Sequence, residues 1–133
     1  MSTILTKQIR NFTDIDFSFA KHPITNNVTI KKDVNAIKQS VINLLTLREG
    51  DKPFHPEISS PIHLFLFENF SLVTSIVLES EIKKYLNIYE PRVNVESVDL
   101  SQSSTNDLRV VLTCTITNTS EPFVVNVLIE RLR

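Results

Sequence analysis

A chain of 133 residues, 41% hydrophobic and 22% charged, is expected to fold as one domain that needs no disulfide or metal for stability. The net charge of −1 comes without any block of like charge, which argues against nucleic acid and anionic membrane surfaces as partners. No apolar run approaches the ~20 residues that cross a bilayer, and the polar start lacks the apolar core of a secretory signal, so a soluble protein that stays in its compartment of synthesis is expected.

The first 31 residues are expected to form an extended N-terminal arm or hairpin. Ile15, Phe17 and Phe19 alternate with polar residues, which predicts a short half-buried strand. A turn-prone segment follows, and Val28 and Ile30 then predict a second extended piece.

Residues 32–89 carry helical patterns. Asp33 is expected to cap the first helix, which should end near Gly50. The predicted buried face of this helix recurs at steps of three and four residues: Val34, Ile37, Val41 and Leu44.

Two further helices are predicted before residue 90. Ser60 and Pro61 mark the start of a short one, because serine caps helices and proline is tolerated at the first helical position. Ser71 can cap the third helix, in which Glu79 and Lys83 can pair on the outside. Its predicted buried face is Leu78, Ile82, Tyr85 and Tyr89.

Residues 90–133 are predicted to form the strands of a mainly antiparallel sheet, so the fold class is α+β. A phase change at Ser97 indicates a bulge in the first strand, and Ser101–Asp107 reads as a polar connection. The next strand alternates cleanly, with Leu108, Val110, Leu112, Cys114 and Ile116 on one face.

The final strand is apolar on both faces. Phe123, Val125, Val127 and Ile129 share one face, and Val124, Leu128 and Leu132 share the other. A strand of this kind near a terminus is either covered by its own chain or bound by another, and its edge amides would let a partner add strands.

The corner Glu90-Pro91-Arg92 joins the helical part to the strands. Pro91 cannot continue a helix, so it holds two opposite charges on a stiff turn. At an interface, Arg92 could grip a partner carboxylate while Glu90 accepts from a partner cation. The alternatives are a solvated turn, or an internal role with Arg92 paired to Glu68 or Asp14; a large stability loss in Arg92→Ala would indicate the internal role.

Several of these segments occur together, in order and at matching spacings: Asp14-Ile15-Asp16, Asp33 with Ile37 and Leu44-Leu45, Gly50 followed by Pro53-Phe54 and Pro56, Leu66-Phe67-Glu68, and Glu90-Pro91-Arg92-Val93. In this the chain resembles the sheath-initiator baseplate wedge proteins of contractile phage tails, which are related to type VI secretion baseplate subunits. The chain departs from that pattern at Glu57-Ile58-Ser59 and at Asn69, where the relatives' usual proline is missing.

The resemblance implies a structural part, not an enzyme, which docks on the wedge core and templates the first ring of tail sheath. Glu90, Pro91 and Arg92 would engage the wedge core, and Val124, Leu128 and Leu132 in the sheath-facing C-terminal hairpin would contact the sheath protein. The implied partners are other wedge subunits and the sheath protein within a six-fold hetero-oligomeric baseplate. The implied location is the host cytoplasm during assembly and then the baseplate of the virion tail.

Some relatives carry a lysozyme-like label, so glycoside hydrolysis of peptidoglycan is the alternative. It requires two carboxylates about 5 to 10 Å apart, one with a raised pKa, and the candidates are Asp51, Glu57, Glu68 and Glu90. The sequence shows neither the spacing nor the cleft, so no catalytic residue is predicted.

No cofactor or metal is expected. A chain with a single glycine cannot form a glycine-rich phosphate loop. His55 and Glu57 offer two ligands in one loop, with His22 and His63 elsewhere, but structural zinc usually has four closely organised ligands, often thiolates. The one cysteine, Cys114, is expected to be a small buried residue of a strand.

Overall fold

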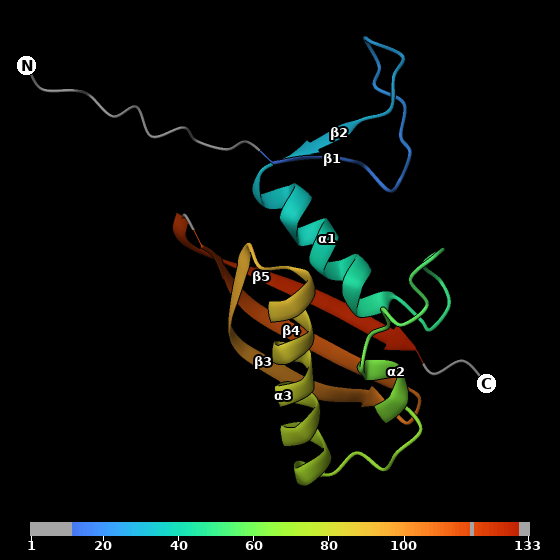
Figure 1. The fold of residues 1–133 in the computed structure, drawn as a ribbon, viewed down its shortest axis with the longest axis vertical. Helices are drawn as coiled ribbons and strands as arrows, with labels where there is room; N and C mark the ends of the chain where they lie inside the picture. Colours follow the sequence, from blue (N-terminus) through green and yellow to red (C-terminus); the bar gives the residue numbers. More distant parts are fainter. Residues whose placement is uncertain (1–11, 118, 131–133) are drawn as a thin grey trace, which may run out of the picture. The chain divides into compact units, whose positions relative to one another are not determined.

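The computed structural model describes residues 12–117 and 119–130. Its elements, in chain order, are β1 (Thr13–Ile15), β2 (Ile30–Lys32), α1 (Val34–Thr46), α2 (Ile62–Phe65), α3 (Leu72–Tyr89), β3 (Val93–Ser104), β4 (Asp107–Ile116) and β5 (Thr119–Glu130) (Figure 1). The predicted α+β class, with three helices and an antiparallel C-terminal sheet, is confirmed.

Contacts divide the chain into two compact units, Met1–Ala36 and Ile37–Arg133. The single-domain organisation, with boundaries at residues 31 and 89, stays a prediction. Within the described ranges no helix is both long and apolar enough to cross a bilayer.

The N-terminal unit contains the predicted hairpin. Its strands β1 and β2 pair antiparallel, with Ile15 opposite Ile30. The prediction of a half-buried strand reaching Phe19 was wrong, because β1 ends at Ile15 and the alternating side chains Ile15, Phe17 and Phe19 are each more than half exposed. The reason is a local turn: the carboxylate of Asp16 accepts from the amide of Ser18, which draws the backbone out of the extended conformation.

Helix α1 begins directly after Asp33, as predicted, although Asp33 has a φ of +52° rather than the extended backbone of a usual N-cap. Its inner face is fully buried at Ile37, Val41 and Leu45. Leu45 thus replaces the predicted Leu44: steps of three and of four both keep a side chain on the same helix face, and the packing buries the residue four after Val41. The helix ends at Thr46, a few residues before Gly50, whose φ of +83° suits glycine in the following turn.

Helix α3 begins where the sequence predicts, and the Ser71 hydroxyl accepts from the Thr74 amide at 3.2 Å. Helix α2 begins one residue later than predicted, at Ile62, with Pro61 in place of Ser60 at its N-cap; the Ser60 hydroxyl still accepts from the Ile62 amide at 3.4 Å. On α3, Leu86 is buried in place of the predicted Tyr89, which is 37% exposed. The fully or nearly buried residues of α3 are Leu78, Ile82, Tyr85 and Leu86. The outer pair is present, with Lys83 Nζ 2.8 Å from Glu79 Oε1.

Replacing Ser71 by alanine is expected to lower the free energy of unfolding by about 1 kcal/mol, because the Thr74 amide loses its acceptor at the start of α3. Urea denaturation measures this. The matched control is Ser80→Ala, an exposed site within the same helix, where alanine is the better helix former. Equal losses from both substitutions would show that the Ser71 cap contributes nothing.

The C-terminal sheet has the order β3-β4-β5, with both pairs antiparallel. The register shifts between Val95 and Ser97, which confirms the predicted irregularity. The predicted polar connection Ser101–Asp107 is too long, because β3 continues to Ser104 and β4 already begins at Asp107. Polar residues at these strand ends still pair through their backbones, so polarity alone does not mark a loop.

The core of the second unit lies between one face of this sheet and the helices. Helix α3 packs on β3, and the ammonium of Lys38 on α1 lies 5.9 Å from the ring centroid of Phe123 on β5. The Tyr85 hydroxyl donates to the Leu44 carbonyl at 3.1 Å and so links α3 to α1; burial, then the neighbouring Tyr89, raises the pKa of Tyr85 to about 12. The inward strand residues are those predicted: Leu108, Val110, Leu112, Cys114, Ile116, Phe123, Val125, Val127 and Ile129.

Candidate partner-binding surfaces

The Glu90-Pro91-Arg92 corner ends α3 and starts β3. The Glu90 amide still donates to the Leu86 carbonyl at 2.8 Å, while the Glu90 carbonyl accepts from the Val93 amide at 3.1 Å. A tight turn therefore closes around Pro91, whose ring blocks further helix. Thr117, directly after the C-terminal end of β4, supports the same turn, because its amide donates to the Arg92 carbonyl at 3.0 Å.

The two charges of the corner pair with each other. Arg92 donates from Nε to Glu90 Oε1 at 2.5 Å and from Nη2 to Glu90 Oε2 at 2.8 Å. The hydroxyl of Ser40 on α1 also donates to Glu90 Oε2, at 2.5 Å. Glu90 is only 3% exposed, whereas the Arg92 side chain is 38% exposed. The carboxylate is thus an internal anchor, and the guanidinium is its surface-facing partner.

Sequence reasoning identified the corner but neither of these partners. The predicted internal partners of Arg92 were Glu68 and Asp14, whereas the acid that pairs with it is Glu90, two residues earlier. Ser40 was missed, although it left a signal: a hydroxyl within the buried stripe of α1, next to Val41, needs a polar group opposite it.

The pKa of Glu90 is lowered from its usual value of 4.5. Burial on its own would raise this pKa, but the hydrogen bonds from Arg92 and Ser40 and the charge of Arg92 outweigh it. Because the folded chain binds this proton less readily than the unfolded chain, the stabilisation is present above the unfolded pKa and is lost as the pH falls through the folded pKa.

The melting temperature of the wild type is therefore expected to fall on acidification more steeply than that of Glu90→Gln, which keeps the shape but cannot ionise. Thermal melts between about pH 3 and pH 7 measure the difference. All other carboxyl groups are common to both proteins and cancel in the comparison. Parallel curves would show that Glu90 is not the acid-sensitive group.

The outer face of the sheet carries the second predicted surface. Val124 and Leu128 alternate with the buried residues of β5 and are each 50% exposed. They lie opposite Thr113 and Arg109 of β4, respectively. Leu132, the third residue predicted for this surface, lies outside the described residues. Neither outer strand of the sheet has a second neighbour among the described elements, so β3 and β5 each present one edge.

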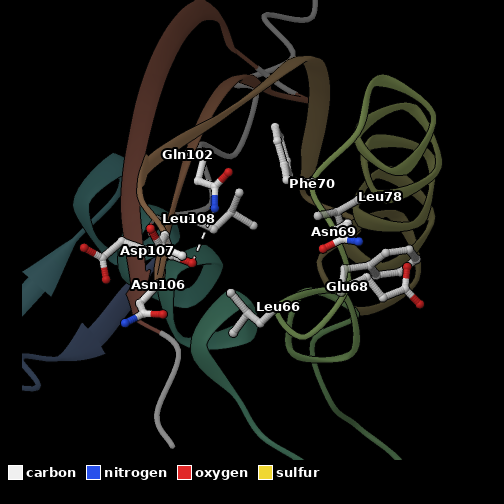
Figure 2. A pocket seen from close by; sticks show the side chains of 11 residues that line it. Leu66, Glu68, Asn69, Phe70, Leu78, Gln102, Asn106, Asp107 and Leu108 are labelled. Carbon is white, nitrogen blue, oxygen red and sulfur yellow. Dashed lines mark hydrogen bonds between the residues drawn. The ribbon is translucent and has the colours of Figure 1, made fainter.

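A cavity of about 300 Å³ lies between the loop after α2 and the β3–β4 turn (Figure 2). Figure 2 shows Phe70, Leu78 and Leu108 around its apolar part, with the amide groups of Asn69 and Gln102 near them. Two acidic residues, Glu68 and Asp107, also line it, and Asp107 accepts from the Ser104 hydroxyl at 2.8 Å. The volume is at the lower limit of small-ligand sites.

The four candidate carboxylates for glycoside hydrolysis, Asp51, Glu57, Glu68 and Glu90, lie in different surroundings. Glu90 is buried in its ion pair, and its pKa is lowered. The pKa of the exposed Glu57 is also lowered, by a backbone hydrogen bond and by His55. Asp51 accepts from the Arg48 amide at 2.9 Å, and Glu68 lines the cavity. A general acid requires a raised pKa, so neither Glu57 nor Glu90 has the required environment.

The histidines and the cysteine are engaged in local structure. His55 Nδ1 lies 3.0 Å from Glu57 Oε1, and His63 Nε2 lies 3.2 Å from the Thr46 carbonyl. Among the described residues, no three potential ligands gather into a metal-binding group. Cys114 is fully buried, and burial together with the charge of Glu96 raises the pKa of its thiol to about 11, which disfavours a thiolate nucleophile.

Comparison with known proteins gives a consistent result. The family model for "Baseplate wedge protein gp25" matches residues 31–121. The baseplate wedge protein gp25 of Enterobacteria phage T4 is 30% identical over 89 residues, which is 67% of this chain and 67% of that protein.

Solved structures share the fold. A protein of the anti-feeding prophage baseplate, in a six-fold symmetrised reconstruction, superposes with a TM-score of 0.70 at 22% identity, over 84% of this chain and 90% of that one. A putative tail lysozyme from Geobacter sulfurreducens gives a TM-score of 0.65 at 22% identity, over 73% of this chain and 89% of that one. A chain of the postcontracted pyocin R2 baseplate has a TM-score of 0.60 at 18% identity, over 79% of this chain and 98% of that one.

Proposed function

The chain belongs to the family of baseplate wedge protein gp25 and is a structural component of the baseplate of a phage or tail-like particle, and on this premise we propose that it docks on the wedge core and templates the first ring of tail sheath. Docking uses the Glu90-Pro91-Arg92 corner, and templating uses the outer face and edge of β5.

The observation that carries the docking proposal is the fork between Arg92 and Glu90. Because two hydrogen bonds fix the plane of the guanidinium, little side-chain entropy remains to be lost when a partner binds it. Pro91, exposed beside it, is also rigid, because its ring fixes the backbone angle φ. The exposed part of Arg92 contacts a carboxylate or carbonyl of the wedge core. The buried Glu90 does not touch the partner but holds the Arg92 side chain in position.

The geometry of β5 supports the templating proposal. A strand with a free edge can accept a strand from another chain through backbone hydrogen bonds, and alternate side chains then give specificity. Val124 and Leu128 supply apolar contacts at such alternate positions. Leu132, which lies outside the described residues, is the third residue proposed for this contact. The sheath protein is the proposed donor of the added strand.

In this role the chain acts by assembly and not by catalysis, which agrees with the lowered pKa values of Glu57 and Glu90. It joins wedge subunits and sheath protein in a six-fold hetero-oligomer, assembles in the host cytoplasm and remains in the tail baseplate. No nucleic acid or membrane takes part.

Binding of the purified chain to wedge complexes tests the docking role. Arg92→Lys is the informative variant, because lysine keeps the charge beside Glu90 but lacks the fork that can serve two acceptors at once. Its affinity for wedge complexes is expected to fall while the chain remains folded. The matched control is Arg109→Lys on the exposed face of β4, which should bind as the wild type does. Equal binding by both variants and the wild type would contradict docking through Arg92.

A further inference from the structure

The most exposed large hydrophobic side chain of the described residues is Phe54, at 96%. It lies on the loop between α1 and α2, with Pro53 before it and Pro56 after it. Single exposed apolar residues are common and need no explanation. Phe54 has a positive φ as well, a combination that it shares with Phe19, but the ring of Phe54 is more exposed and its loop is more firmly braced.

The strain comes from the turn that carries the ring. The His55 amide donates to the Lys52 carbonyl at 3.3 Å, so residues 52–55 form a β-turn with Pro53 in its second position. Phe54 occupies the third position with a φ of +67°. Proline followed by a residue of positive φ is the pattern of a type II turn, in which the third position favours glycine or asparagine. An aromatic residue here is disfavoured in the free chain.

The loop is nevertheless well braced. At its start, the Arg48 amide donates to Asp51 Oδ2 at 2.9 Å and the Asp51 amide donates to the Arg48 carbonyl at 3.1 Å. At its end, Ile58 is buried and the Ser60 amide donates to the Leu47 carbonyl at 2.9 Å. The ring is therefore held away from its own unit by a fixed backbone, which is the preorganisation that binding residues require.

We propose that Phe54 is an aromatic anchor that inserts into an apolar cleft of a neighbouring wedge subunit. This inference rests on the proposed function, to which it adds a third contact besides the Arg92 corner and β5. A protruding ring requires a concave acceptor, and buried aromatic rings are the residue type that dominates binding energy at interfaces. The charged neighbours Lys52 and Glu57, both exposed on the same loop, require a polar rim around that cleft.

The test is Phe54→Gly, because strain and binding then change in opposite directions. Glycine accepts the positive φ, so the melting temperature is expected to equal or exceed that of the wild type. Affinity for purified wedge complexes is expected to fall at least tenfold, which is about 1.4 kcal/mol. Phe54→Tyr keeps the ring and is expected to retain most of the affinity. Leu64→Ala, which truncates another exposed apolar residue, is the matched control and should bind as the wild type does.

The outcomes separate this inference from the docking proposal. If the wild type binds wedge complexes, Arg92→Lys weakens binding and Phe54→Gly does not, the anchor is overturned and the docking role stands. A lower melting temperature of Phe54→Gly would place the ring in the chain's own fold and would also overturn it. An oligomeric wild type that becomes monomeric in Phe54→Gly, measured by light scattering, would assign the cleft to a second copy and overturn the wedge assignment.

Discussion

Replacing Glu90 by alanine is expected to lower the free energy of unfolding by about 2 to 3 kcal/mol. The carboxylate is 3% exposed and accepts three hydrogen bonds, from two atoms of Arg92 and from the Ser40 hydroxyl. Removing it leaves these donors unpaired at the junction of α1, α3 and β3. The loss stays below the largest values for buried pairs because the Arg92 side chain is 38% exposed and can partly rehydrate.

Chemical denaturation with urea measures this loss. The matched control is Glu96→Ala, an exposed glutamate on β3 close to the corner, for which a change within about 0.5 kcal/mol is expected. Similar effects at both positions would mean that the buried fork does not stabilise the fold.

The buried carboxylate also changes how Arg92→Ala must be interpreted. Removing Arg92 would leave Glu90 buried with Ser40 as its remaining donor of the three, so a stability loss is expected whether or not Arg92 binds a partner. A thermal melt alone therefore cannot separate the internal role from the interfacial one. Arg92→Lys, measured by binding, makes that separation.

The double replacement Val124→Thr and Leu128→Thr is expected to reduce sheath growth at least tenfold while wedge binding is retained, if the proposed templating face is correct. Both side chains are half exposed on β5, and threonine keeps a high strand propensity, so the chain should still fold. What is lost is apolar surface for the incoming sheath subunit.

Sheath growth on wedge complexes, followed by electron microscopy, measures this effect. Asn94→Thr, an exposed change to the same residue type on β3, is the control. A chain ending at Pro122 would be a poor substitute, since it removes the buried residues Phe123, Val125, Val127 and Ile129 together with the outer face. Normal sheath growth from the double variant would contradict the templating face.

Most of the second unit could be predicted from the sequence, because its local and long-range preferences agree. Ser71 caps α3, and the alternation from Leu108 to Ile116 is the buried face of β4. The N-terminal segment was harder. Alternation of Ile15, Phe17 and Phe19 indicates a half-buried strand only where something packs on it, and the turn at Asp16 ends the strand first.

The candidate surfaces were only partly predictable. Sequence reasoning found the corner because proline breaks a helix at a definite place. It did not find the Glu90–Arg92 fork or the role of Ser40, since α1 and the corner are 50 residues apart and only the packing brings them together. The exposure of Phe54 could not be predicted either, because an aromatic residue between two prolines is as compatible with a buried loop as with an exposed one.

Sheath polymerisation from wedge complexes that lack this chain is the most direct test of the proposed function. Sheath protein is added with and without the purified wild-type chain, and the fraction of complexes that carry sheath is counted by electron microscopy. The proposal predicts that ordered sheath forms only when the chain is present. Equal sheath growth in its absence would contradict the templating role.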